Sequence, residues 1–459
     1  MKDIQDVVVI GGGPAGSTVA SYLAKKGHSV TVLEKEKFPR IHVGESLLPF
    51  CYSLFQELGV LDQMKKRFVR KPTVRFISSD GKTSTNWCFN HVIKDESYLS
   101  FQVERSEFDT ILLENSRKCG VTVKEQTRVR KVDFDSDGDT FQVYASGANG
   151  EEEMYRARFL IDASGRSSFL ATKNGWRKPH KEFERTALWT HWKNVKSLKG
   201  GLEEGASLIM YLGGEKRGWS WIFPLGLNQV TTGVVMDTSY LRHQKQEVFG
   251  NSQDWATALY LQELMSSEFA RNLLDDAKIA MPIQVEGDYS YYSEKKFGAR
   301  YALVGDAGRF IDPIFSSGVY LSMKSGSLVA NALDEMLASN NLDDNAPLEQ
   351  VYKTINGAYD LVYRLINLFY NPHAISFAEA GSLFQSKQKE HEDGMAAGHY
   401  MLAGDFFENN EKYHKYLNLL AEPRQFDFYR DYVINREEFH NPCNTDVSMI
   451  FPAVSSGVN

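Results

Sequence analysis

Three glycines near the N-terminus, followed at a distance by an acidic residue, have the spacing of a phosphate-binding turn. Gly11, Gly13 and Gly16 form a G-x-G-x-x-G pattern directly after the β-branched run at residues 7–10. In this pattern the first glycine permits a tight turn, the second lets a pyrophosphate approach the backbone, and the third lets helix and strand pack closely. Glu34 follows about 20 residues later, where a carboxylate can bind a ribose hydroxyl. The pattern predicts a dinucleotide site.

A strand, a helix and a second strand must position these residues. Residues 7–10 predict a buried strand of a parallel sheet, and residues 17–26 predict a helix with Gly27 as its C-cap. Residues 29–33 predict the second strand, which ends at Glu34. This order of elements is typical of a Rossmann-like fold.

The next stretch, residues 35–49, predicts an irregular loop because prolines and glycines interrupt it. Arg40 and the Gly44-Glu45-Ser46 turn supply polar groups suited to holding phosphates. An ordinary connecting loop is the alternative. The glycine turn beside it favours a binding role.

Three later segments could complete such a site. Arg105 opens a predicted amphipathic helix, and a predicted strand from residue 159 ends at Asp162 before a glycine turn. Another apolar strand ends at Gly305-Asp306, and a loop framed by Pro313 and Gly318 precedes a long predicted helix. The N–H groups and positive dipole end of that helix could stabilise an anion.

Two tryptophans and a lysine bear on the reaction. Trp219 and Trp221 lie two residues apart, so on a strand both face the same side. Such a pair could shield a cofactor from direct contact with the substrate, although two core tryptophans would give the same spacing. Lys71 lies among other basic residues and is either a solvated charge or, if buried, an amine of lowered pKa.

Together these motifs resemble the FAD monooxygenase superfamily, closest to its branch of flavin-dependent halogenases and geranylgeranyl-reductase-like enzymes. The resemblance covers most of residues 1–332 and includes the stretch FPRxxxGESLLP from residue 38 and the segments from residues 101, 159 and 301. RGWSWIFPL, from residue 217, is similar to the W-x-W-x-I-P signature of the halogenases, with Phe223 in place of the usual Ile.

The resemblance implies a FAD-dependent halogenase. It would use reduced FAD (FADH2), O2 and a halide (chloride, bromide or iodide) to form hypohalous acid and halogenate an electron-rich aromatic small molecule. Lys71 would be catalytic, and Ser317 and Gly318 would hold the halide. Trp219, Trp221 and Pro224 would line the tunnel. The implied cofactor-binding residues are Gly11, Gly13, Pro14, Ala15, Gly16, Glu34, Lys35, Arg40, Gly44, Glu45, Ser46, Arg105, Asp162, Gly165, Gly305, Asp306, Pro313 and Gly318.

An alternative is an FAD-dependent aromatic monooxygenase (hydroxylase) or a geranylgeranyl-reductase-like oxidoreductase, which would need the FAD segments but not the tryptophans or Lys71. Phe315 occupies the place where tryptophan halogenases carry a glutamate, which resembles the phenol- and pyrrole-type branch. A single dinucleotide fingerprint implies a separate NAD(P)H-dependent flavin reductase. The sequence leaves open whether the substrate is free or bound to a carrier protein.

The chain is predicted to be an α/β protein built around a discontinuous FAD-binding domain of the glutathione-reductase type, at residues 1–67, 101–185 and 290–340. Residues 68–100 and 186–289 alternate apolar and polar side chains, which predicts an inserted, mostly antiparallel substrate-binding sheet. Residues 341–459 predict a helical C-terminal region, where recurring aromatics such as Phe369 and Tyr370 are expected to be mainly core.

Composition excludes several classes of protein. The net charge of −7 leaves no basic footprint of a nucleic-acid binder, and no apolar stretch is long enough for a membrane span. The four cysteines are scattered without metal-ligand spacing, which predicts free thiols, no metal site and a cytoplasmic protein. A homo-oligomer is compatible with the sequence.

Overall fold

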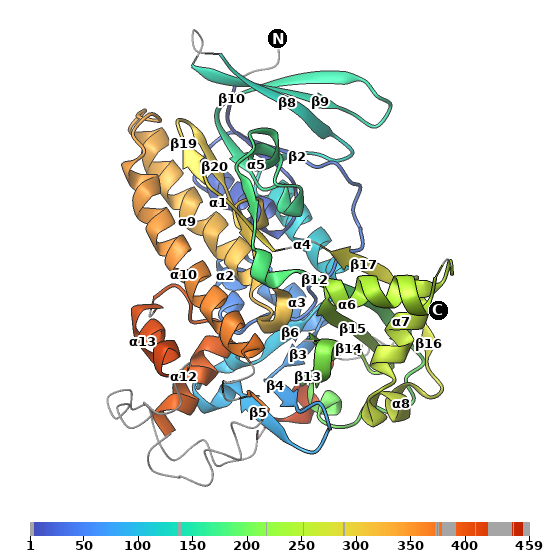
Figure 1. The fold of residues 1–459 in the computed structure, drawn as a ribbon. Coiled ribbons are helices and arrows are strands. Elements are labelled where there is room, and N and C mark those ends of the chain that lie inside the picture. The colour runs from blue at the N-terminus through green and yellow to red at the C-terminus, as the bar shows by residue number, and fades with distance from the viewer. Residues whose placement is uncertain are drawn as a thin grey trace, which may run out of the picture.

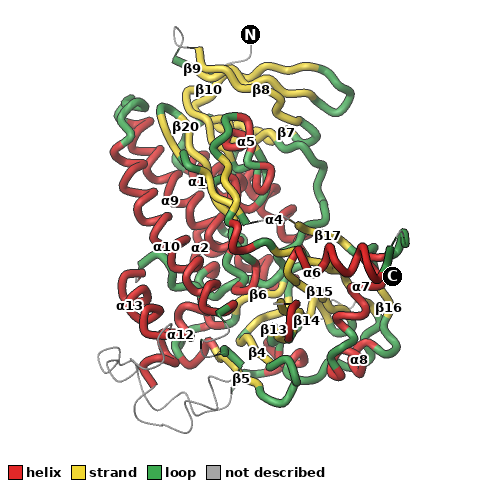
Figure 2. The backbone as a smooth tube through the Cα atoms, in the orientation of Figure 1, coloured by secondary structure: helices red, strands yellow, loops and turns green. Residues whose placement is uncertain are grey.

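Two large β-sheets organise the chain, with helices against both (Figures 1 and 2). The computed structural model describes residues 4–371, 374, 376–378, 392–420, 443 and 445–452, apart from residues 136–138, 217, 251, 288–289 and 409. Within this part of the chain, no helix combines the length and apolar character that crossing a membrane requires.

The first sheet is parallel at its centre, as expected for a Rossmann-like fold. Its parallel strands, in spatial order, are β20 (Tyr301–Leu303), β10 (Glu152–Asp162), β1 (Gln5–Ile10), β2 (Val30–Leu33) and β7 (Thr122–Lys124). Strands β19 (Phe297–Gly298), β8 (Arg128–Asp135) and β9 (Thr140–Ser146) extend it antiparallel. Helix α1 (Pro14–Lys25) packs against α9 (Gly318–Ala338) and α4 (Arg105–Lys118). The first predicted helix therefore begins three residues earlier than expected.

The second sheet is mostly antiparallel, as the alternation predicts. Its strands are β4 (Thr73–Ile77), β5 (Ser84–Cys88), β12 (Arg185–Lys193), β13 (Ser207–Leu212), β14 (Gly218–Gly226), β15 (Gln229–Asp237), β16 (Lys278–Ile279) and β17 (Gln284–Gly287), and only the β4–β13 pair is parallel. Three helices not predicted from the sequence follow β15, namely α6 (Thr238–His243), α7 (Trp255–Leu264) and α8 (Glu268–Leu274). They cover a hydrophobic cluster on this sheet.

Smaller elements complete the fold. A three-stranded sheet contains β11 (Arg177–Pro179), β18 (Tyr291–Ser293) and β21 (Arg309–Phe310), next to the short helix α5 (Phe169–Lys173). Helices α2 (Cys51–Leu58) and α3 (Leu61–Arg67) lead to β3 (Val69–Lys71), which pairs with β6 (Ser100–Gln102). The described C-terminal region is helical, with α10 (Ala346–Tyr370), α12 (Glu392–Ala403) and α13 (Asn410–Leu420). The predicted domain boundaries stay a prediction.

Two expectations need correction. Cys88 and Cys443 form a disulfide with their Cα atoms 5.6 Å apart, so only Cys51 and Cys119 are free. The two cysteines are 355 positions apart in the sequence, so no local spacing rule could have predicted the pair. The other expectation concerns the sheet predicted from residue 68 onward: β3, which contains Lys71, pairs with β6 in a separate two-stranded sheet. The large sheet begins at β4, two residues later.

Candidate active site

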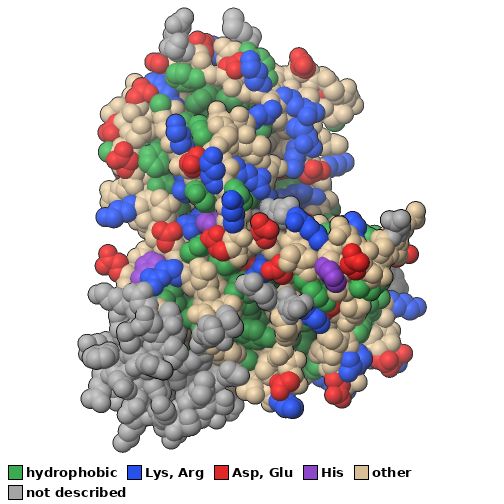
Figure 3. Space-filling model, in the orientation of Figure 1, with side chains coloured by type: hydrophobic (Ala, Val, Ile, Leu, Met, Phe, Trp, Pro, Cys, Tyr) green, Lys and Arg blue, Asp and Glu red, His purple; other side chains and the backbone are tan. Residues whose placement is uncertain are grey.

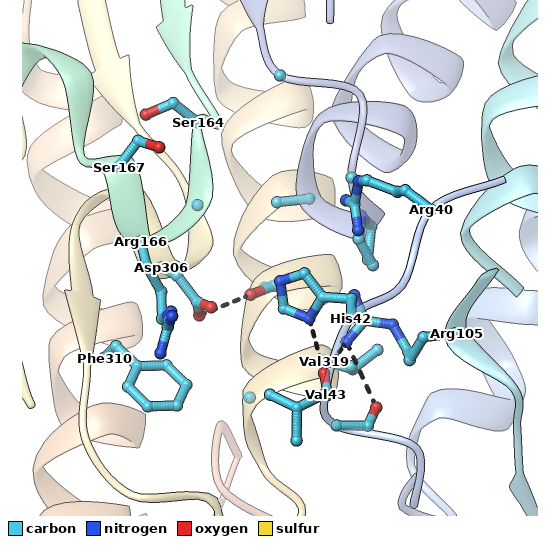
Figure 4. A pocket seen from close by; sticks show the side chains of 18 of the residues that line it. Arg40, His42, Val43, Arg105, Ser164, Arg166, Ser167, Asp306, Phe310 and Val319 are labelled. Atoms are coloured by element: carbon cyan, nitrogen blue, oxygen red, sulfur yellow. Dashed lines mark hydrogen bonds between the residues drawn. The ribbon is translucent and has the colours of Figure 1, made fainter. Parts of the chain in front are cut away.

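A cavity of about 940 Å³ is lined by residues from both large sheets. Figure 4 shows the part of it around Arg40, His42 and Asp306. Gly11 and Gly13 of the β1–α1 turn line it on one side, and Trp219 and Trp221 of β14 line it on another. The predicted site residues that line it are Gly11, Gly13, Pro14, Ala15, Glu34, Lys35, Arg40, Gly44, Glu45, Ser46, Arg105, Gly165, Trp219, Trp221, Asp306, Pro313 and Gly318. Segments far apart in the sequence therefore meet at one site.

Six predicted site residues lie outside the lining of this cavity. They are Gly16, Lys71, Asp162, Pro224, Gly305 and Ser317. Gly16 packs against the first strand, where a Cβ would clash with the Gly11 carbonyl oxygen. Asp162 is fully buried and accepts hydrogen bonds from the backbone N–H groups of Ser164 (3.0 Å) and Leu170 (2.7 Å). Both therefore support the walls of the cavity.

The glycine turn and Glu34 have the geometry of a nucleotide site. Gly11 has a φ of +101°, which favours glycine, and a Cβ at Gly13 would lie 3.3 Å from Arg40 Nη2. The Glu34 carboxylate accepts the N–H groups of Gly12 and Glu36, both at 2.7 Å. Each carboxylate oxygen keeps a lone pair that can accept a ribose hydroxyl.

Two arginines face the cavity beside a buried aspartate. Arg105 donates two hydrogen bonds, of 2.8 and 2.9 Å, to the Asp109 carboxylate. It donates a third, of 2.6 Å, to the Val43 carbonyl oxygen. Burial opposes the ionised form of Asp109, but Arg105 outweighs it and lowers the pKa of Asp109. Arg40 Nη1 lies 3.2 Å from Asp109 and, among the described residues, has no hydrogen-bond partner. A buried arginine donor at a glycine turn fits a phosphate.

His42 is a cavity residue that sequence reasoning missed. Its Nδ1 lies 2.7 Å from the Val43 carbonyl oxygen, and because a carbonyl only accepts, Nδ1 carries the proton and Nε2 is an acceptor. Burial, aided by the charge of Arg105, lowers the pKa of His42 to about 3, so the ring is neutral. Figure 4 shows it between Arg40 and Asp306. No spacing rule singles out this histidine in the loop.

The third predicted segment delivers a carboxyl group and a helix N-terminus. Asp306 lines the cavity and accepts a hydrogen bond from Ser322 at 3.3 Å, and burial raises its pKa to about 6. Ser317 is the N-cap of α9 and is 2% exposed, while its neighbours Ser316 and Gly318 line the cavity. The free N–H groups of the first helical turn therefore lie next to the cavity.

Aromatic side chains of the second sheet form a further wall. The Trp219 and Trp221 rings lie 5.4 Å apart, and Phe223 stacks on Trp221 at 6.3 Å. All three line the cavity, so the period of two predicted for a strand is confirmed for these positions. Pro224 continues the strand outside the lining, next to an irregular register.

Lys71 is buried rather than solvated. Its side chain is 2% exposed, its Nζ donates to the Leu47 carbonyl oxygen at 2.9 Å, and it lies 5.6 Å from the centre of the Phe89 ring. Burial lowers the pKa of Lys71 to about 7. The amine therefore exists in comparable amounts of its charged and neutral forms near neutral pH. Leu47 follows Ser46, a cavity residue, so Lys71 lies just behind the cavity wall.

A second missed feature joins the two sides of the cavity. His191 on β12 bonds Glu45 of the loop at 2.8 Å, and both residues are buried. Burial opposes the charged form of His191, but the hydrogen bond and charge of Glu45 outweigh it and raise the pKa of His191. The partners are 146 residues apart, which no sequence signal bridges.

Basic side chains surround much of the cavity. The cationic lining residues, beyond those already described, are Lys35, Arg128, Arg130, Arg166 and Lys173. Figure 3 shows Lys and Arg side chains gathered at mid-height of one face, although the whole chain carries a net charge of −7. A local positive potential favours a polyanionic ligand such as a dinucleotide.

The match to known proteins agrees with this geometry. The family model of the FAD binding domain matches residues 5–344. A tryptophan 2-halogenase of Chondromyces crocatus is 30% identical over 90% of this chain and 80% of its own length. A 1H-pyrrole-2-carbonyl peptidyl-carrier-protein chlorinase of Pseudomonas fluorescens is 30% identical over 80% of this chain and 83% of its own length. The structure of the flavin-dependent brominase Bmp2 superposes with a TM-score of 0.76 and 28% identity, over 92% of this chain and all of its own.

The fold and site define an FAD-binding protein of the glutathione-reductase type. Its cofactor is FAD, which fits the glycine turn, the basic lining and Arg40, whose Nη1 donates no hydrogen bond to any described residue. The chain belongs to the flavin-dependent halogenases. The described residues contain no group of three or more His, Cys, Asp or Glu side chains placed to hold a metal ion.

Proposed function

We propose that this enzyme halogenates an electron-rich aromatic small molecule of the phenol or pyrrole type, with Lys71 as the catalytic residue. The observation that carries the proposal is the burial of Lys71 behind a cavity wall that includes Trp219 and Trp221. Bound FAD in its reduced form would supply the electrons that activate O2. Oxidation of a halide then yields hypohalous acid, which transfers its halogen to the aromatic ring.

Lys71 can act on hypohalous acid in either protonation state. As an ammonium group it donates a hydrogen bond to the oxygen and makes the halogen more electrophilic. As a neutral amine it attacks the halogen of hypohalous acid to form a haloamine, and the displaced hydroxide takes the amine proton and leaves as water. A pKa of about 7 makes both forms available near neutral pH.

Ser317 and Gly318 are the proposed halide site. They begin α9, whose free N–H groups and positive dipole end favour an anion. Trp219 and Trp221 would keep the aromatic substrate away from the cofactor. The halide, not the substrate, would then meet the activated oxygen.

The partners belong to the same proposal. A separate NAD(P)H-dependent flavin reductase would supply reduced FAD, since the sequence has one dinucleotide fingerprint. Phe315, buried against the Phe76 and Phe369 rings, offers no acid for an indole, which favours phenols and pyrroles. A carrier-bound substrate and a cytoplasmic location stay predictions.

The test is a reaction of purified enzyme with FAD, a flavin reductase, NADH, O2 and each halide in turn. A panel of phenols, pyrroles and indoles would be read by mass spectrometry. Lys71→Met, which keeps the buried volume, should lower product by at least about 100-fold, a typical loss for a catalytic group, while reduced-flavin oxidation continues. Lys82→Met, at a lysine that is 82% exposed, should match the wild type.

Hydroxylated product formed without halide would contradict the proposal and favour the aromatic monooxygenase. Halogenation of indoles alone would overturn the substrate class but keep the reaction.

A further inference from the structure

A buried hydrogen-bonded chain joins three elements beside the cavity. Trp219 Nε1 on β14 lies 2.9 Å from the hydroxyl oxygen of Tyr370, the last residue of α10. The same hydroxyl lies 3.0 Å from Asp312 Oδ2. Asp312 Oδ1 in turn accepts the backbone N–H of Ile314 at 3.0 Å. Trp219 and Asp312 are 2% and 3% exposed, so little water reaches these bonds.

The donors and acceptors fix the direction of this chain. An indole N–H can only donate, so the Tyr370 oxygen accepts from Trp219 and gives its single proton to Asp312. A phenylalanine at position 370 would leave the Trp219 N–H and one Asp312 oxygen unpaired. A buried polar group that loses its partner costs more than the hydrogen bond contributed.

The two ends of the chain reach two parts of the proposed machinery. Trp219 belongs to the aromatic wall of the cavity. Asp312 begins the loop at residues 312–318, which carries the proposed halide site and whose residues Pro313, Ser316 and Gly318 line the cavity. The wall comes from the second sheet, whereas the loop follows β21 of the three-stranded sheet. Tyr370 bonds to both from a third element.

Neighbouring side chains hold the Tyr370 ring. The Arg185 guanidinium lies 4.5 Å from the ring centre and is itself bound to Asp237 at 2.9 Å. Phe369 and Phe183 pack around the ring at 5.1 and 6.2 Å. These contacts fix the position of the Tyr370 hydroxyl, which therefore determines the distance between Trp219 and Asp312.

We propose that Tyr370 is a positioning residue that fixes the halide loop against Trp219. The inference rests on the proposed function, because the loop is a halide site only if the enzyme is the halogenase described above. Tyr370 does not line the cavity, so its loss should change halide affinity more than FAD binding.

The kinetic test compares Tyr370→Phe with Tyr359→Phe. Tyr359 lies on the same helix, is 5% exposed, and its hydroxyl has no hydrogen-bond partner among the described residues. At saturating reduced FAD and substrate, Tyr370→Phe should raise the halide KM about tenfold, the effect of one buried hydrogen bond, with kcat within about twofold. Tyr359→Phe should behave as the wild type. Asp312→Asn, which offers one acceptor oxygen to two donors, should reproduce the Tyr370→Phe effect.

A second readout needs no turnover. In protein labelled with 5-fluorotryptophan, the ¹⁹F resonance of Trp219 is assigned by its absence from Trp219→Phe. Tyr370→Phe and Asp312→Asn should both shift that resonance, and Tyr359→Phe should not. If Tyr370→Phe fails to fold, judged by circular dichroism, Asp312→Asn carries both tests.

An unshifted Trp219 resonance in both variants would overturn the inference, as would a halide KM within twofold of the wild type. If the wild type halogenates nothing with any halide, the proposed function fails. The resonance shifts then still decide whether Tyr370 couples Trp219 to the loop.

Discussion

Around the cavity, burial determines the charge state of individual residues. Lys71 follows Lys65, Lys66 and Arg67 in the sequence, yet its burial lowers its pKa to about 7. Burial likewise keeps His42 neutral, with a pKa of about 3. A charge count over the sequence would assign a proton to Lys71 in every molecule at neutral pH. The choice of Lys71 as catalytic residue rests on the family resemblance, whereas its basic neighbours alone favour a solvated charge.

The His191–Glu45 pair predicts a pH-dependent stability. The folded pKa of His191 is raised above its unfolded value of about 6.5, so the pair stabilises the fold fully below that value. This stabilisation is lost as the pH rises through the folded pKa. Glu45→Gln should therefore lower stability below about pH 6.5, by about 1.5–3 kcal/mol for a hydrogen bond to a charged group. Urea unfolding at a series of pH values measures it.

His28 provides the control for this experiment. It bonds Asp334 at 2.7 Å, but Asp334 is 28% exposed, so solvent screens the pair. His28→Gln should change stability less than His191→Gln. Equal pH profiles for the wild type and His191→Gln would contradict the assignment.

Local chemistry explains which residues the sequence could reveal. Gly11, Gly13 and Glu34 lie within one strand–helix–strand unit, so their spacing carries the prediction. His191 and Glu45 meet only because β12 and the loop after β2 share a cavity wall. The same holds for Trp219 and Tyr370, which are 151 residues apart. Tyr370 was expected to be a core residue, and in addition its hydroxyl bonds Trp219 and Asp312.

At the scale of elements, the β1–α1 junction depends on close backbone contact. A Cβ at Gly16, within α1, would clash with the carbonyl oxygen of Gly11, which directly follows β1. Gly16→Ala should therefore destabilise the protein by about 1–3 kcal/mol, as overpacking does, and weaken FAD binding because the glycine turn shifts. Denaturant unfolding and an FAD titration followed by fluorescence measure the two effects.

Gly226→Ala is the matched control, because nothing lies within 4 Å of a Cβ at that position. It should leave stability and FAD affinity within the error of the wild type. An unchanged FAD affinity in Gly16→Ala would show that the turn tolerates the shift.

Element boundaries were predictable where periodicity and glycine agree. Strands β1 and β2 and helix α1 follow from β-branched runs and the glycine turn. Helices α6 and α8 were missed although Asp237 and Ser267 cap them, because helices of six and seven residues show too little periodicity. The separate β3–β6 sheet was not predicted because β3 and β4 follow each other in the sequence with only Pro72 between them. They therefore look like one strand.

At the scale of the whole molecule, the described residues 445–452 lie beside β3, the strand that contains Lys71. The Arg70 N–H donates to the Ile450 carbonyl oxygen at 2.7 Å, and the Ile450 side chain is fully buried against Val69 and Leu99. The Cys88–Cys443 disulfide links the chain next to these residues to β5. The described C-terminal segment therefore packs against β3 and stabilises the strand that contains Lys71.

Cys88→Ser should lower the midpoint of thermal unfolding by several degrees, since a disulfide typically stabilises a fold by about 2–4 kcal/mol. A reductant should lower the wild-type midpoint similarly and leave the variant unchanged. Cys119→Ser, at a free cysteine, is the control and should not alter the response to reductant. A wild-type midpoint that is indifferent to reductant would contradict the disulfide.

The FAD cavity is assembled from residues that range from Ile10 to Ser322, which has a consequence for synthesis on the ribosome. At ~5–20 residues per second, the first glycine turn emerges about 15–60 s before the last wall of its site. Early in that interval β1 lacks its parallel neighbour β10, and β10 later lacks its own parallel neighbour β20. The complete FAD site can form only after the start of α9 has left the exit tunnel, so we expect FAD to bind late in the synthesis and folding of this chain.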